Sequence, residues 1–216
     1  MRASAKISLT VTSFGLMIML SLSACRSEPP QTPPPPVTRA KPQVKRELGM
    51  FSEVEGTPHL IAAITAREEG GFLSKLESSS SGYERDALNY VFINKDDDSI
   101  RRLLPNNDSL ILSAIRFPEK GKVEWFMYQV VKSDSNNDGE LSYKDRTTIA
   151  VSDSGGNGYA ELVSDVEARL GYAMSDANTL LVLYVKDAKK HYSKIDLPNR
   201  KLLVTNEFPS LGDDVK

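Results

Sequence analysis

The chain has 216 residues, with 27 basic and 29 acidic side chains and a formal net charge of −2 at pH 7. Residues 47–216 hold 20 basic and 28 acidic side chains, a formal charge of −8. This balance argues against nucleic-acid binding, which requires a basic face, and is compatible with binding a cation. About 170 residues suffice for one domain with a sizeable core, and the single cysteine excludes an intrachain disulfide.

Residues 1–24 have the order of an export signal. Arg2 and Lys6 precede an apolar run over residues 7–22, and small residues follow at a cleavage point. A membrane-spanning helix needs about 20 mostly apolar residues, whereas this run is shorter and interrupted by serine and threonine. The pattern predicts a signal peptide that is removed.

The only cysteine follows directly after this signal, in the sequence Leu22-Ser23-Ala24-Cys25. This tetrapeptide resembles the lipobox of bacterial lipoproteins, which implies a diacylglyceryl group on the Cys25 sulfur and a further acyl chain on the new amino terminus. Two or more acyl chains hold a protein stably on a membrane. Arg26 stands where Asp would resemble an inner-membrane retention signal, so an outer-membrane location facing the periplasm is favoured. The alternative is an ordinary secretory signal with a chance cysteine.

Residues 25–46 combine the lipidated cysteine with a linker that contains seven of the twelve prolines. Proline fixes φ and removes an amide donor, which predicts a polyproline-II-like spacer. At about 3.1 Å per residue it would reach on the order of 65 Å. The formal charge of +4 over residues 26–46 suits contact with anionic lipid or peptidoglycan, and the alternative is a soluble stalk.

Residues 47–216 are dominated by short runs of β-branched and aromatic residues that alternate with period two between turn residues. The pattern predicts one all-β domain. The expected strands are 59–67, 72–78, 89–94, 100–104, 110–117, 123–132, 147–152, 160–163, 170–174, 179–186, 191–196 and 201–205. The segments 123–132 and 179–186 are apolar on both faces, which predicts central strands covered on both sides.

A strand, a polar turn and a second strand recur three times, at 89–104, 147–163 and 191–204, each after a longer apolar strand. This unit resembles a blade of a β-propeller. The segment 174–184 is similar to the propeller repeats of Tol-Pal-system proteins, with Ala177 in place of the usual glycine. The resemblance implies about three antiparallel blades in an open or partial propeller, because a closed ring needs about four to eight. A β-sandwich is the alternative.

Residues 134–145 form the strongest chemical motif. Carboxylate or amide oxygens fall at loop positions 1, 3, 5 and 12 and glycine falls at position 6, a spacing typical of calcium loops. The loop resembles those of EF-hands and, because Asp stands at position 12, those of dockerins. The expected Ca²⁺ ligands are the side chains of Asp134, Asn136, Asp138, Ser142 and Asp145 and the carbonyl of Glu140.

Strands are expected on both sides of this loop, where an EF-hand has helices. The setting predicts a structural clamp rather than a helix pair that opens on binding. A 12-residue connection is long for a hairpin, and its acidic side chains would repel one another without an ion. The alternative is a solvated turn rich in Asp, Asn and Gly.

No catalytic residue is expected. His59 and His191, the only histidines, lie 132 positions apart in predicted strands. The sequence lacks a Gly-x-Ser-x-Gly elbow, a His-Glu-x-x-His motif and a phosphate-binding glycine loop. The glycine-rich segment 155–158 is expected to be a hairpin turn, and Trp125 is expected to be a core residue.

These observations favour a membrane-anchored envelope lipoprotein that is not an enzyme. Its calcium-braced β domain is expected to bind an envelope protein or a cell-wall polymer such as peptidoglycan. The alternative is a hydrolase of envelope polysaccharide or peptide that uses paired carboxylates, as glycosidases do. A cleft that holds two carboxyl groups about 5 to 10 Å apart would favour the hydrolase.

Overall fold

The computed structural model describes residues 45–67 and 86–209. The predicted signal peptide, Cys25, nearly all of the linker and the predicted strand 72–78 lie outside the described residues. No helix in the described ranges is long and apolar enough to cross a membrane. The strands are β1 (Lys45–Leu48), β2 (Ser52–Glu53), β3 (His59–Arg67), β4 (Asn89–Asn94), β5 (Ile100–Arg102), β6 (Leu110–Phe117), β7 (Trp125–Val131), β8 (Thr147–Asp153), β9 (Ala160–Val166), β10 (Ala168–Met174), β11 (Thr179–Lys186), β12 (Lys189–Asp196) and β13 (Lys201–Glu207).

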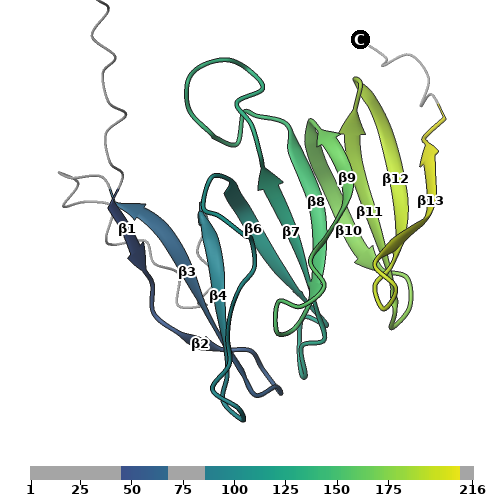
Figure 1. Ribbon diagram of the computed structural model, residues 1–216. Helices are drawn as coiled ribbons and strands as arrows, with labels where there is room; N and C mark the ends of the chain where they lie inside the picture. The colour runs from purple at the N-terminus through teal and green to yellow at the C-terminus, as the bar shows by residue number, and fades with distance from the viewer. Residues whose placement is uncertain (1–44, 68–85, 210–216) are drawn as a thin grey trace, which may run out of the picture. The chain divides into compact units, whose positions relative to one another are not determined.

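These strands form three antiparallel sheets that follow one another along the chain (Figure 1). Sheet A has the order β1-β3-β4-β5, with β2 paired to β3. Sheet B has the order β6-β7-β8-β9, and sheet C has the order β10-β11-β12-β13. The three predicted strand-turn-strand repeats are the last hairpin of each sheet, namely β4-β5, β8-β9 and β12-β13. The prediction of three antiparallel blades is confirmed.

Sheet A differs most from the predicted strands. The sequence does not predict β1 and β2, which are short and are held by pairing with β3. β5 ends at Arg102, two residues before the predicted end. The fully buried Asn89 donates a hydrogen bond to the carbonyl of Leu104 (3.0 Å) and accepts one from its N–H (2.9 Å). Leu103 still donates a backbone hydrogen bond to the Tyr90 carbonyl (2.9 Å), and at Leu104 the bonds to the Asn89 side chain take the place of strand pairing.

Sheet B is buried on both faces. In β7, Phe126 and Tyr128 pack into a core cluster with sheet A, whereas Met127 packs into a second cluster with sheet C. The rings of Phe126 and Phe92, in β4, lie edge to face with their centroids 6.0 Å apart, a favoured aromatic geometry. The prediction that β7 is a central strand covered on both sides is confirmed.

Sheet C is covered on one face only in the described part of the chain. Leu180, Val182 and Tyr184 of β11 are buried in the cluster shared with sheet B. Leu181 and Leu183, which alternate with them, are half-buried and belong to neither core cluster. The prediction that β11 is covered on both sides is therefore wrong for the described residues, because sheet C is the last of the three sheets.

The glycine-rich turn between β8 and β9 lies against sheet A. Asp153 closes the turn by accepting hydrogen bonds from the N–H groups of Gly155 (2.9 Å) and Asn157 (2.7 Å). Gly156 has a φ of +75°, and a Cβ atom there would lie 2.6 Å from the Phe92 ring. The expected hairpin turn is present, and it needs glycine at this position both for its backbone conformation and for its packing.

Gly156→Ala should lower the free energy of unfolding by at least about 2 kcal/mol, because it adds strain at a positive φ and overpacks the buried ring. Gly171→Ala, in β10, is the matched control, since a Cβ atom there would meet nothing within 4 Å and its φ is not in the positive range. That variant should change the free energy of unfolding by less than about 0.5 kcal/mol. Chemical denaturation of both variants measures the difference, and equal stabilities would contradict the packing of this turn.

Candidate functional site

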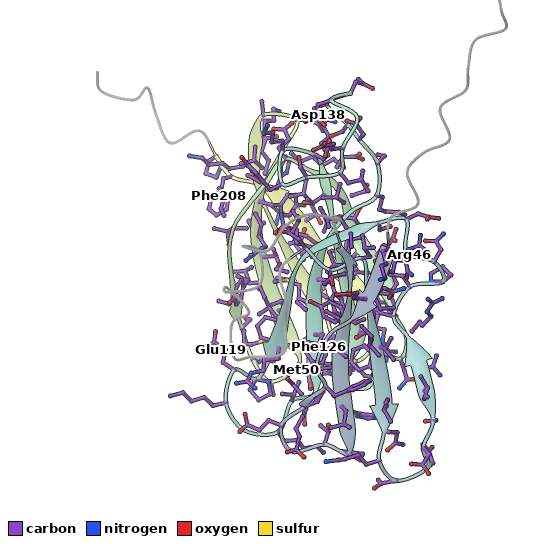
Figure 2. All side chains as sticks on the ribbon, turned by 90° about the vertical axis from the view of Figure 1, so that its left-hand side faces the viewer. Arg46, Met50, Glu119, Phe126, Asp138 and Phe208 are labelled. Atoms are coloured by element: carbon purple, nitrogen blue, oxygen red, sulfur yellow. The ribbon has the colours of Figure 1, made fainter. Side chains whose placement is uncertain are left out.

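The candidate calcium loop connects β7 to β8 and extends beyond the end of sheet B (Figure 1). Figure 2 shows Asp138 in this loop at one end of the domain, away from the buried Phe126. Val131, the last residue of β7, lies opposite Thr147, the first residue of β8. The β-ladder therefore holds the two ends of the loop together, in the strand-loop-strand setting that the sequence predicts.

The first half of the loop is folded by its own polar side chains. The Asp134 carboxylate accepts hydrogen bonds from the N–H groups of Gly139 (2.7 Å) and Asp138 (3.2 Å). Asn136 Oδ1 accepts a second bond from the Asp138 N–H (2.8 Å). Asn137 and Gly139 have φ values of +61° and +92°, in the left-handed region that asparagine and glycine adopt most readily. The predicted sharp turn at Gly139 is present.

Asp145 holds the second half of the loop against the first. Asp145 is almost completely buried, with 2% of its surface exposed. Oδ1 accepts hydrogen bonds from the N–H groups of Ser135 (2.7 Å) and Asn136 (3.3 Å), and Oδ2 accepts one from the N–H of Ser142 (2.9 Å). The carboxylate thus joins loop positions that are up to ten residues apart.

The same contacts shift the pKa of the Asp145 carboxyl group. Burial raises the pKa of Asp145, but the backbone hydrogen bonds from Ser142, Ser135 and Asn136 outweigh it and hold the pKa below its ordinary value. An acid whose pKa is lowered on folding stabilises the folded state above the pKa of the unfolded chain. This contribution is lost as the pH falls through the folded pKa of Asp145.

The remaining predicted ligands take part in the same network. The Glu140 N–H donates to Asp138 Oδ1 (3.1 Å), and Ser142 Oγ accepts a hydrogen bond from the Lys144 N–H (3.2 Å). The oxygen donors fit Ca²⁺ in their chemistry. Within residues 45–67 and 86–209, however, no group of three or more His, Cys, Asp or Glu side chains is arranged to hold a metal ion. An ion would have to draw the carboxylates together or depend on the amide, hydroxyl and carbonyl oxygens.

A cavity of about 210 Å³ lies at the base of this loop. It is formed by the segments that flank the loop and by β9, and its walls include Lys132, Arg146, Thr148, Glu161 and Asp165. Sequence reasoning missed this cavity because its residues come from three separate segments, none of which carries a motif.

The other predicted candidates lie in strands. His59 begins β3 in sheet A, whereas His191 lies in β12 of sheet C and stacks on the ring of Tyr184, with the ring centroids 5.6 Å apart. Trp125 is half-buried and packs against the core between sheets B and C. The guanidinium carbon of Arg200 lies 5.8 Å from the centroid of the Trp125 ring. Trp125 therefore contributes to the core, as the sequence predicts.

No protein-family model and no curated protein matches the chain. Among solved structures, the β-propeller domain of the Trilobed protease from Pyrococcus furiosus, which has an open velcro topology, is similar over 76% of this chain and 44% of that chain. The identity is 12% and the TM-score is 0.39. A luciferin-regenerating enzyme is similar over 76% of this chain and 47% of that chain, with 8% identity and a TM-score of 0.40. The chain spans about half the length of each.

The fold is all-β, with three antiparallel sheets of about four strands each. The sandwich alternative would have two packed sheets, whereas sheet B here packs against a sheet on each side. The similarity is distant and concerns the fold alone.

Calcium should raise the melting temperature of the full chain. At ten times Kd, binding to the folded state adds about 1.4 kcal/mol to the free energy of unfolding, which corresponds to roughly 3 to 6 °C for a domain of this size. Asp138→Ala should remove most of this shift, because it deletes a predicted ligand whose side chain is exposed. Melting curves in chelator and in millimolar calcium measure the effect, and identical wild-type curves would reject the site.

Asp145→Ala is the informative comparison for this experiment. It removes the acceptor for the N–H groups of Ser135 and Ser142, so the melting temperature should fall even in chelator. Asp138→Ala should leave the melting temperature in chelator nearly unchanged. If Asp145→Ala and Asp138→Ala had equal melting temperatures in chelator, the structural role of Asp145 would be contradicted.

Proposed function

We propose that the protein is a membrane-anchored lipoprotein of the bacterial cell envelope whose calcium-braced β domain is a non-catalytic module that binds a protein or a cell-wall polymer. The observation that carries the proposal is the sequence Leu22-Ser23-Ala24-Cys25, which puts the only cysteine directly after an export signal. Lipid on Cys25 would hold the chain stably on a membrane. The outer membrane, with the domain facing the periplasm, is the favoured location.

The segment between the anchor and the first strand supports a spacer role. β1 begins at Lys45, and the 19 residues between Cys25 and Lys45 include seven prolines. An extended chain of this composition rises about 3.1 Å per residue, so it would span on the order of 60 Å. This length would keep the β domain away from the membrane and within reach of another envelope component.

Calcium would brace the connection between β7 and β8. The loop 134–145 offers six oxygen donors, and the charge of −8 over residues 47–216 favours a cation. Because strands flank the loop, binding would stiffen this connection and leave the packing of sheet B unchanged. The proposed ligands are the side chains of Asp134, Asn136, Asp138, Ser142 and Asp145 and the carbonyl of Glu140.

The cavity at the base of the loop supports binding rather than hydrolysis. It holds two carboxylates, which the hydrolase alternative requires, but each is paired with a lysine. Glu161 Oε2 lies 2.7 Å from Lys132 Nζ, and Asp165 Oδ2 lies 3.9 Å from Lys186 Nζ. The Glu161 carboxylate, whose contact with Lys132 is a hydrogen bond, is poorly placed to attack a substrate.

Cys25→Ala should abolish labelling by a palmitate analogue and leave the protein uncleaved or soluble, because the sulfur that would carry the lipid is absent. Metabolic labelling followed by cell fractionation measures both effects. Ser23→Ala is the matched control, since it keeps the cysteine and a small residue before it, and its labelling should persist. Wild-type protein recovered without lipid from the soluble periplasmic fraction would contradict the anchor.

A further inference from the structure

The face of sheet C that points away from sheet B carries a row of aliphatic side chains. Leu181, Leu183 and Val185 alternate in β11 with the three residues that are buried against sheet B, so they lie on the opposite face. All three are half-buried and belong to neither core cluster. Val204 of β13 lies across β12 from Leu181 and is 39% exposed. Aliphatic side chains thus line a face that no other described sheet covers.

Two aromatic side chains extend this surface toward the edge of the sheet. Tyr192 of β12 pairs with Leu183 of β11 and with Asn206 of β13, so it lies on the same face. Its ring meets the ring of Phe208 edge to face, with the centroids 5.5 Å apart, and its hydroxyl accepts a hydrogen bond from Asn206 Nδ2 (2.8 Å). Both rings are half-buried. Aromatic side chains of this kind are enriched where proteins bind other proteins.

The charge of this face is opposite to that of the domain as a whole. β12 places the exposed Lys190 and Lys194 among the apolar side chains, and neither lysine forms an ion pair within the described ranges. Asp196, on the same face, is balanced by Lys201 opposite it. Three lysines against one carboxylate leave a formal charge of +2 on the paired rows of this face, in a domain whose formal charge is −8.

We propose that this face of sheet C is the surface with which the domain binds its partner, and that the partner is a protein with an apolar patch surrounded by acidic side chains. Protein interfaces combine an apolar centre with a polar rim, and opposite charges on the two rims give orientation and specificity. The inference rests on the proposed binding function. It selects a protein over a cell-wall polymer, because a polar polymer would leave the aliphatic row without apolar contacts.

Other occupants match this face less well. A second copy of sheet C would bring Lys190 and Lys194 against the same lysines, and the outer face of sheet A carries Arg46 and Arg102, so either face of a second copy would be repelled. Pairing along the free edge of β13 is disfavoured by the bulge at Leu203. A lipid surface would require apolar side chains that protrude into it, whereas the row on β11 is half-buried.

Photo-crosslinking of the full-length protein in intact cells of its own species tests the proposal. With the photoreactive p-benzoylphenylalanine in place of Val204, a cross-link to a second protein is expected. The same probe in place of the exposed Ile100, in sheet A, is the matched control and should not capture that protein. Lys190→Glu combined with Lys194→Glu should lower the cross-link yield at least about fivefold, because acidic groups would then face each other. Arginine at both positions should preserve the yield.

Mass spectrometry of the cross-linked peptide identifies the occupant. An acidic surface on the captured protein supports the proposal if exchanging its acids for lysine restores the yield of the double glutamate variant. A yield that charge reversal leaves unchanged, or that the exchange does not restore, overturns it. Cross-links only to lipid, to glycan, to a second copy or to residues 210–216 of the same chain, or none, overturn it as well.

Fractionation of the same cells keeps this result separate from the proposed anchoring. Protein that is recovered with the membrane but gives no cross-link overturns the binding face and leaves the lipoprotein proposal intact. Protein that is recovered from the soluble fraction and still gives the charge-dependent cross-link supports the face and overturns the anchor.

Discussion

The aromatic contact between sheets A and B is the interaction on which the rest of the domain depends. Phe92 and Tyr90 of β4 meet Phe126 and Tyr128 of β7, with centroid distances of 6.0 Å between the phenylalanines and 6.3 Å between the tyrosines, and all four rings are almost fully buried. Burial contributes about 1.5 to 3 kcal/mol for a side chain of this size. Because this contact fixes one face of β7, the opposite face can receive sheet C, and the end of β7 can support the loop.

Ser135 connects the candidate calcium loop to the cavity. Its Oγ donates to Asp145 Oδ1 (3.2 Å) and accepts a hydrogen bond from the Arg146 N–H (2.8 Å). Ser135 and Arg146 both line the cavity, whereas Asp145 is a proposed calcium ligand. An ion that fixes the Asp145 carboxylate would therefore also restrict the cavity wall. The loop and the cavity wall thus share a single hydrogen-bond network at one end of sheet B.

The sequence predicts most of the fold because its main signals are local. The bounds of β4 and β11 follow from their alternation and from the turn residues beside them, and the loop residues are close in space because they are close in the chain. The early end of β5 depends on Asn89, whose partner is 15 residues away. No local pattern shows such a bond. Likewise, the alternation of β11 does not say whether another sheet follows, and the cavity at the base of the loop is lined by three separate segments of the chain.

Sheets A and C are each built from consecutive strands, and no β-ladder joins either of them to sheet B in the described strands. Sheet C is therefore attached to sheet B by side chains and a short connection, and it can detach without loss of backbone pairing inside sheet B. Detachment would uncover the face that Leu180, Val182 and Tyr184 occupy. The contact between sheets B and C therefore has to be maintained by the packing of these side chains and not by backbone pairing.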